Sequence, residues 1–139
     1  MKKQIILTLL CIILAGTGCR RVSHNGAIDG YWRIRTIEYK DGTPEEHPED
    51  LFIAIQCELM QLWQTIPSGA QKRDVPTGEM IYDKDAGRLS VDFRDPVNLT
   101  LARLHQFGVC SNPVTFTVHV DGSTMVLTTP ESVITCRKW

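Results

Sequence analysis

The C-terminal stretch VTFTVHVDGSTMVLTTPESVITCRKW (residues 114–139) determines the predicted fold. From Val114 to Val120 apolar and polar residues alternate, which is the pattern of a strand with one face in a core. Asp121-Gly122 and Pro130-Glu131 are turn signals on either side of a second apolar run. The stretch therefore predicts three consecutive antiparallel strands.

Similar strand signals recur toward the N-terminus. Leu89–Phe93 alternates in the same way, and a first strand starting at Tyr31 places Trp32 and Ile34 on one side. Leu51–Cys57 is a further strand, which residues 58–65 either continue as one long bent strand or follow as a separate one. About eight short strands at even spacing predict an all-β fold, either a barrel or a sandwich. An eight-stranded up-and-down antiparallel barrel is the simplest arrangement, because pairing the first strand with the last leaves no exposed edge.

One segment near residues 96–107 favours a short helix. Asp95 is a candidate N-cap, Pro96 suits the first helical position, and Gly108 falls where a helix C′ residue belongs. Val97, Leu101 and Leu104 have helical spacing, although Val97 and Leu101 also fit an alternating strand. The signals at both ends favour the helix.

The N-terminus has the layout of a bacterial export signal. Lys2 and Lys3 precede the apolar run 5–14, which is too short to span a bilayer. Gly16-Thr17-Gly18-Cys19 then predicts removal of residues 1–18. In the lipoprotein interpretation, which we favour, Cys19 receives a lipid. In the alternative, an ordinary signal peptidase cuts at the same place and Cys19 is incidental.

Lipidation of Cys19 would make residues 19–28 a short polar tether between a membrane and a domain spanning residues 29–139. The tether predicts a lipid-anchored protein of the cell envelope, with the membrane as its first partner. Arg20 stands where some bacteria use aspartate to retain lipoproteins in the inner membrane. Its presence favours the outer membrane.

The remaining cysteines are Cys57, Cys110 and Cys136. They allow one disulfide in three pairings, and an oxidising compartment makes a bond plausible. We expect Cys57 to pair with Cys110, with Cys136 as a small buried hydrophobe.

Composition and motifs point away from several classes of function. The chain has 15 Lys and Arg against 16 Asp and Glu, with scattered basic residues, so nucleic acid is not an expected partner. The histidines lack metal-ligand spacing, and Asp83-Lys84-Asp85 fits a hairpin turn better than a calcium loop. In the absence of nucleophile-elbow, P-loop and dinucleotide motifs, we expect no enzyme activity, metal or cofactor. The four histidines are His24, His47, His105 and His119.

The interior of the predicted barrel is the candidate ligand site. Small barrels either fill their interior with side chains or hold one small ligand, and the residues do not separate the two. The candidate cavity residues are Trp32, Ile34, Met80, Leu89, Val91, Phe93, Phe116, Val118, Met125 and Leu127.

Gly30-Tyr31-Trp32 and Arg137 resemble the lipocalin signature, in which a G-x-W tryptophan closes one end of an eight-stranded barrel. The resemblance implies that Gly30, Trp32 and Arg137 form this closure, with the arginine packed over the indole. The T-D-Y turn of lipocalins is absent.

Residues 101–139 also resemble the lipocalin-like, calycin-type domain family of uncharacterised Gram-negative lipoproteins. The likeness rests on Gln106-Phe107-Gly108-Val109, Phe116-Thr117-Val118, Met125-Val126-Leu127 and Arg137-Lys138-Trp139, with a smaller contribution from residues 56–62. It implies a small barrel on a lipid tether, without a particular activity.

Two functions follow as expectations. The first is binding of a small hydrophobic ligand inside the barrel, as a carrier or sensor. The second is a protein-interaction or inhibitor module of an envelope complex, with a filled barrel that acts through the 41–50 or the 66–76 loop. The protein partner in this second function is unknown.

Overall fold

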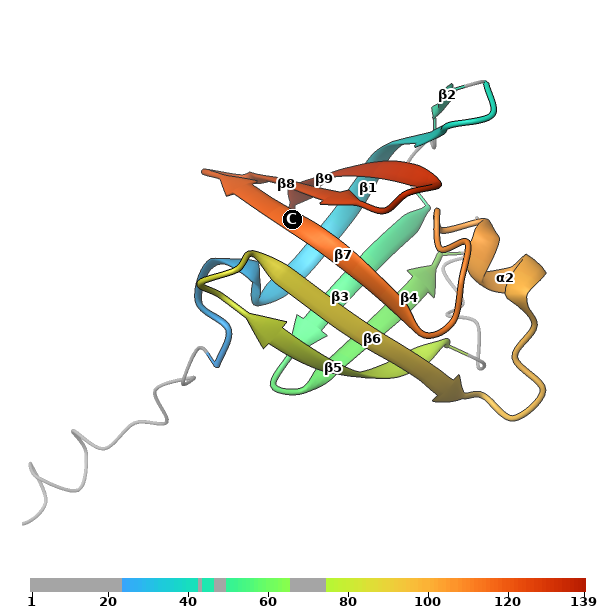
Figure 1. Ribbon diagram of the computed structural model, residues 1–139, viewed down its shortest axis with the longest axis horizontal. Coiled ribbons are helices and arrows are strands. Elements are labelled where there is room, and N and C mark those ends of the chain that lie inside the picture. Colours follow the sequence, from blue (N-terminus) through green and yellow to red (C-terminus); the bar gives the residue numbers. More distant parts are fainter. Residues whose placement is uncertain (1–23, 43, 47–49, 66–74) are drawn as a thin grey trace, which may run out of the picture.

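A computed structural model describes residues 24–42, 44–46, 50–65 and 75–139. Figure 1 shows a barrel of antiparallel strands with a short helix at one end. In chain order the elements are η1 (Gly26–Ile28), β1 (Gly30–Tyr39), β2 (Pro44–Glu46), β3 (Leu51–Gln56), β4 (Leu59–Gln64), β5 (Thr77–Asp83), β6 (Arg88–Asp95), α2 (Leu101–His105), β7 (Val114–Asp121), β8 (Thr124–Thr128) and β9 (Ser132–Lys138).

The predicted up-and-down barrel is confirmed. Neighbouring strands pair in the order β1-β3-β4-β5-β6-β7-β8-β9, and β9 pairs with β1 to close the sheet. The closing ladder runs antiparallel from Trp32 opposite Lys138 to Tyr39 opposite Ser132, with a register shift between Ile34 and Thr36. Closure leaves these eight strands with both edges hydrogen-bonded, which removes the usual template for aggregation.

β2 is an addition to the predicted set. The segment 41–50 was expected as a solvated loop, but Pro44–Glu46 pairs with Thr36–Glu38 of β1. The reason lies in the length of β1, since β3 covers only Gly30–Arg33 of that edge. The uncovered part of β1 accepts the short strand.

The segment 51–65 is a hairpin of two strands, as one of the two predicted alternatives has it. β3 and β4 pair from Leu51 opposite Gln64 to Gln56 opposite Leu59, and Cys57 in the turn has a positive φ of 55°. Alternation sends Ile53 and Leu62 inward and leaves Phe52 and Trp63 on the outer face.

The helix exists but begins later than predicted. Asp95 is the last residue of β6, where it pairs with Thr77, so it does not cap a helix. Asn98 then has a φ of 74°, which no helix tolerates. The α-helix is α2, residues Leu101–His105, with Thr100 at its N-cap. Among the described residues no helix has the length and hydropathy needed to cross a bilayer.

Gly108 ends the helical segment as predicted. Its φ is +82°, its N–H donates to the carbonyl of His105 (2.9 Å), and the N–H of Val109 donates to that of Leu104 (3.2 Å). These two bonds define a Schellman motif with Gly108 at C′. A Cβ at this position would lie 2.7 Å from Cγ1 of Ile134, so glycine also allows close packing on the barrel.

Candidate functional site

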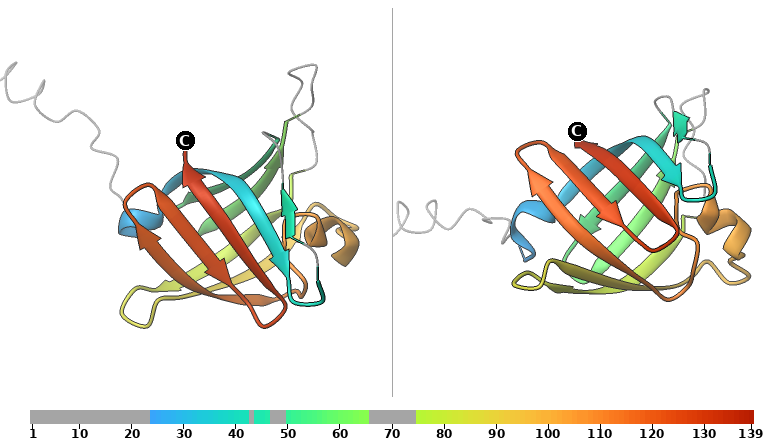
Figure 2. Two further views of the ribbon diagram at one scale, coloured as in Figure 1. Left: turned by 90° about the horizontal axis from the view of Figure 1, so that it is seen from above. Right: turned by 45° about the horizontal axis from the view of Figure 1, so that its top comes forward.

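The connections between strands differ at the two ends of the barrel. The tether end carries η1, the short turns 57–58, 84–87 and 122–123, and the C-terminus. The loop end carries the short turn 129–131 and the longer connections 40–50, 65–76 and 96–113, with α2 in the last. Figure 2 shows η1 at one end of the barrel and α2 at the other. The up-and-down order dictates this separation, because alternate connections fall on the same end.

The tether end is closed by η1 beneath Trp32. The indole is fully buried, and its Nε1 donates to the carbonyl of Ile28 at 2.8 Å. The amide of Asn25 donates to Asp29 (2.6 Å) and to the carbonyl of Cys57 in the β3–β4 turn (2.7 Å). The chain that leads in from residue 24 is therefore fastened to the barrel wall.

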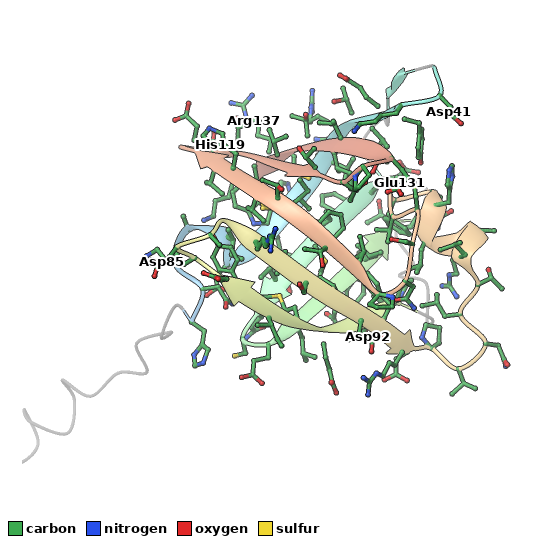
Figure 3. All side chains as sticks on the ribbon, viewed as in Figure 1. Asp41, Asp85, Asp92, His119, Glu131 and Arg137 are labelled. Carbon is green, nitrogen blue, oxygen red and sulfur yellow. The ribbon has the colours of Figure 1, made fainter. Side chains whose placement is uncertain are left out.

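The cation over Trp32 is Lys138, so the prediction that Arg137 fills this position is wrong. Lys138 Nζ lies 5.1 Å from the ring centroid and donates to the carbonyl of Ala27 at 3.5 Å. Period two explains the exchange, because inward-facing Cys136 forces its neighbour Arg137 outward. Figure 3 shows Arg137 on the outside of the barrel. Gly30 stands at the start of β1 with a φ of +123°.

The predicted cavity residues form one packed core. Nine of the ten are 0–3% exposed, and Val118 is partly buried against them. Side chains that lined a cavity would retain accessible surface, and these retain almost none. Cys136 is fully buried in this core, as predicted. Period two in β3, β4 and β9 would also have identified further members that were not predicted: Ile53, Ile55, Met60, Leu62 and Ile134.

The loop end is filled by α2 and the segment that follows it. Leu104, Phe107 and Val109 are each 1% exposed and belong to the same core. A recess of about 10 Å³ lies beside them, which is room for about one water molecule. Its lining residues are Leu62, Gln64, Val75, Pro76, Arg103, Gln106 and Phe107.

Polar contacts hold this segment to the barrel rim. The ring of His105 stacks on Tyr39 with centroids 4.5 Å apart, and the Tyr39 hydroxyl donates to the His105 carbonyl. Ser132, which is fully buried, donates from Oγ to the carbonyl of Gly108 at 2.5 Å. These contacts join α2 to β1 and β9.

The predicted disulfide between Cys57 and Cys110 is wrong. Both thiols are unpaired, as is that of Cys136. Cys57 lies in a turn at the tether end and Cys110 follows α2 at the loop end, so the length of the barrel separates them. Burial raises the pKa of Cys110, Glu131 and Asp41 add to the rise, and a hydrogen bond with Ser132 opposes it. Burial also raises the pKa of Cys136.

Other predicted features lie apart from one another or outside the described residues. His24, His105 and His119 are all exposed, on the tether, α2 and β7, and no group of three His, Cys, Asp or Glu gathers in the described parts of the chain. Figure 3 shows His119 near the C-terminal end of β7. Residues 1–23, with Cys19, lie outside the described residues, as do His47 and residues 66–74.

The outer face of β1, β3 and β4, with Trp139 after β9, carries aromatic side chains that were not predicted to form a common surface. Phe52 is paired across the strands with Trp63. The ring of Trp139 lies 5.4 Å from that of Phe52, and the Trp139 N–H donates to the carbonyl of Tyr31 at 3.0 Å. We call Tyr31, Phe52, Trp63 and Trp139 the aromatic face. Alternation shows each residue facing outward, but only the strand register shows that they adjoin.

Comparison with known proteins agrees with this architecture. The chain is similar in structure to a lipocalin-like protein from Bacteroides uniformis ATCC 8492, with a TM-score of 0.64 and 22% identity over 82% of this chain and 100% of that one. It is also similar to an uncharacterized protein from Bacteroides eggerthii DSM 20697, with a TM-score of 0.61 and 17% identity over 80% of this chain and 98% of that one. No curated protein matches the sequence.

The sequence profile of the lipocalin-like domain matches residues 12–139, which includes every described strand. Proteins with this fold typically bind other molecules. The chain belongs to the lipocalin-like domain family.

Proposed function

We propose that this protein is a lipid-anchored lipoprotein of the outer membrane, without enzyme activity, that binds a protein partner through the loop end of a filled barrel. The lipid on Cys19 would hold the tether end at the membrane. The loop end, at the opposite end of the barrel from the anchor, would then contact the partner.

The filled interior is the observation that carries this proposal. Pockets for drug-sized ligands measure about 300–1,000 Å³, whereas the recess beside Phe107 measures about 10 Å³. Fully buried Trp32, Phe116 and Met125 occupy the space that a carrier would keep for its ligand. The packing therefore favours the protein-interaction hypothesis over the ligand-carrier hypothesis.

The distribution of the connections supports the loop end as the contact. The tether end has short turns and the incoming chain, so the longer segments face away from the anchor. Val97 and Leu101 lie in the loop-end connection 96–113 and are 81% and 51% exposed. Exposed apolar side chains on connecting segments often form protein–protein interfaces.

The anchor is tested by the mass of the mature N-terminal peptide isolated from membranes. We expect this peptide to begin at Cys19 and to carry the mass of a lipid. A peptide that begins at an unmodified Cys19 would contradict the anchor and would support ordinary signal cleavage.

The protein contact is tested by photocrosslinking in the cells that encode the protein. A photoreactive phenylalanine at Val97 or Leu101 should yield one defined adduct shared by the two positions. The matched control is Ile81, which is apolar and about as exposed as Val97 but lies on the barrel wall in β5. Adducts of equal yield at Ile81, or none at the loop end, would contradict the proposal.

A further inference from the structure

The aromatic face is a row of outward-facing aromatic side chains that neither the filled barrel nor the loop end uses. Trp139 is 82% exposed and Tyr31 is 54% exposed, while Phe52 and Trp63 are half-buried. Leu59, at the tether end of β4, extends the apolar surface. Tryptophan and tyrosine combine an apolar body with a polar group, which suits them to the boundary between a membrane and water.

The charged residues near this face in β1, β3, β4 and β9 are mainly basic, and Glu38, Asp50 and Glu58 lie at the strand ends. Residues 30–37 and 132–139, which cover most of β1 and β9, contain Arg33, Arg35, Arg137 and Lys138 but no acidic residue. Strands β3 and β4 contain no charged residue. Basic residues next to aromatic ones match an anionic lipid surface, because each cation near the headgroups adds electrostatic attraction.

The aromatic face also begins where the tether joins the barrel. Tyr31 lies three residues after Ile28, the last residue of η1, and the backbone N–H of Trp139 donates to the carbonyl of Tyr31. Cys19 precedes His24 by five residues, which reach about 18 Å when fully extended. A lipid on Cys19 would therefore keep this part of the barrel wall close to the lipid headgroups.

We infer that the aromatic face, with exposed Arg137 beside it, rests on an anionic phospholipid surface. This inference rests on the proposed lipid anchor and adds an orientation to it: the barrel lies with β1, β3 and β4 against the membrane. The opposite wall, around β7 and β8, faces away from the membrane.

The chain offers its own fluorescent probes for the test. Its tryptophans are Trp32, which is buried in the barrel, and Trp63 and Trp139 on the aromatic face. The mature protein, purified from membranes, is reconstituted into vesicles of phosphatidylethanolamine and phosphatidylglycerol, with and without brominated acyl chains. Flotation of the vesicles reports the anchor, and quenching of tryptophan emission by the brominated lipid reports contact.

We expect the protein to float and its emission to be quenched. The double variant Trp63→Phe with Trp139→Phe, which leaves only Trp32, should float equally and lose most of the quenching. The matched control adds Thr117→Trp on the outer face of β7 to the double variant. This new tryptophan should not restore quenching.

The outcomes separate the two proposals. If the native protein floats but its emission is not quenched, the orientation is overturned and the anchor stands. The same conclusion follows if Thr117→Trp restores quenching to the double variant. Failure to float would overturn the anchor, and the orientation with it.

Discussion

Lys138 covers the indole of Trp32, with its ammonium nitrogen 5.1 Å from the ring centroid, while the neighbouring Arg137 points outward from the same strand. In the lipocalin signature that this chain resembles, an arginine has the covering position. Here a lysine one residue later reaches over the end of the barrel and also binds the Ala27 carbonyl. The closure is thus kept with a different cation.

Removing that cation should destabilise the barrel modestly. Lys138→Met preserves most of the side-chain volume but loses the contact with the ring, which at an exposed site contributes about 0.5–1 kcal/mol. The loss should appear as a lower free energy of unfolding in urea. Arg137→Met is the control and should change that free energy by less than about 0.5 kcal/mol. A larger loss in the control would mean that Arg137 is the closing residue.

Gly108 should tolerate no side chain. An alanine Cβ would lie 2.7 Å from Ile134 and 3.0 Å from Ile37, at a φ of +82°. Overpacking and the left-handed backbone together should cost about 2–4 kcal/mol in thermal or urea unfolding. Gly122→Ala is the matched control, since Gly122 also has a positive φ but has no atom within 4 Å of the added Cβ. Gly122→Ala should lower the free energy of unfolding by about 1–2 kcal/mol. An equal loss in both variants would show that close packing at Gly108 contributes nothing.

A filled barrel should be sensitive to truncation of its interior. Phe116→Ala removes a fully buried ring and should lower the free energy of unfolding by about 3–5 kcal/mol. Ile81→Ala, on the exposed face of β5, should change it by less than about 0.5 kcal/mol. A near-neutral Phe116→Ala would show that the interior is hollow and able to lose a ring.

The three thiols should differ in their rates of alkylation. Cys57 is exposed and should react first, Cys110 is half-buried and slower, and Cys136 should react only on unfolding. Because burial raises the pKa of Cys110, its reactive thiolate is scarcer than in an ordinary thiol, so its rate should still rise above pH of about 8.5. Mass spectrometry of peptides resolves the three sites, and Cys110→Ser should remove the slow phase alone. Loss of two thiols together under native conditions would indicate the disulfide that the structure lacks.

Much of the fold was predictable because period two and turn residues report it locally. The hairpins from β5 to β9 and the inward residues Trp32, Leu89 and Phe116 follow from alternation alone. The end of the helix was also predictable, because the residue after a helix often needs a positive φ, which glycine adopts readily.

The errors share a different origin, since each depends on register or on distance through space. Asp95 has the residue type of an N-cap, but its pairing with Thr77 keeps it in a strand. Cys57 and Cys110 have no sequence feature that places them at opposite ends of the barrel. The aromatic face was missed for the same reason, because Phe52 and Trp139 adjoin only once the barrel has closed.

The filled barrel is the central claim, and the mass of the intact protein tests it most directly. The lipidated protein, released from membranes in mild detergent, is measured by mass spectrometry first under native and then under denaturing conditions. A covalent lipid on Cys19 contributes to both masses, so their difference is the mass of any molecule held in the barrel. We predict no difference, whereas a stoichiometric hydrophobic ligand lost on denaturation would contradict the filled barrel and restore the ligand-carrier hypothesis.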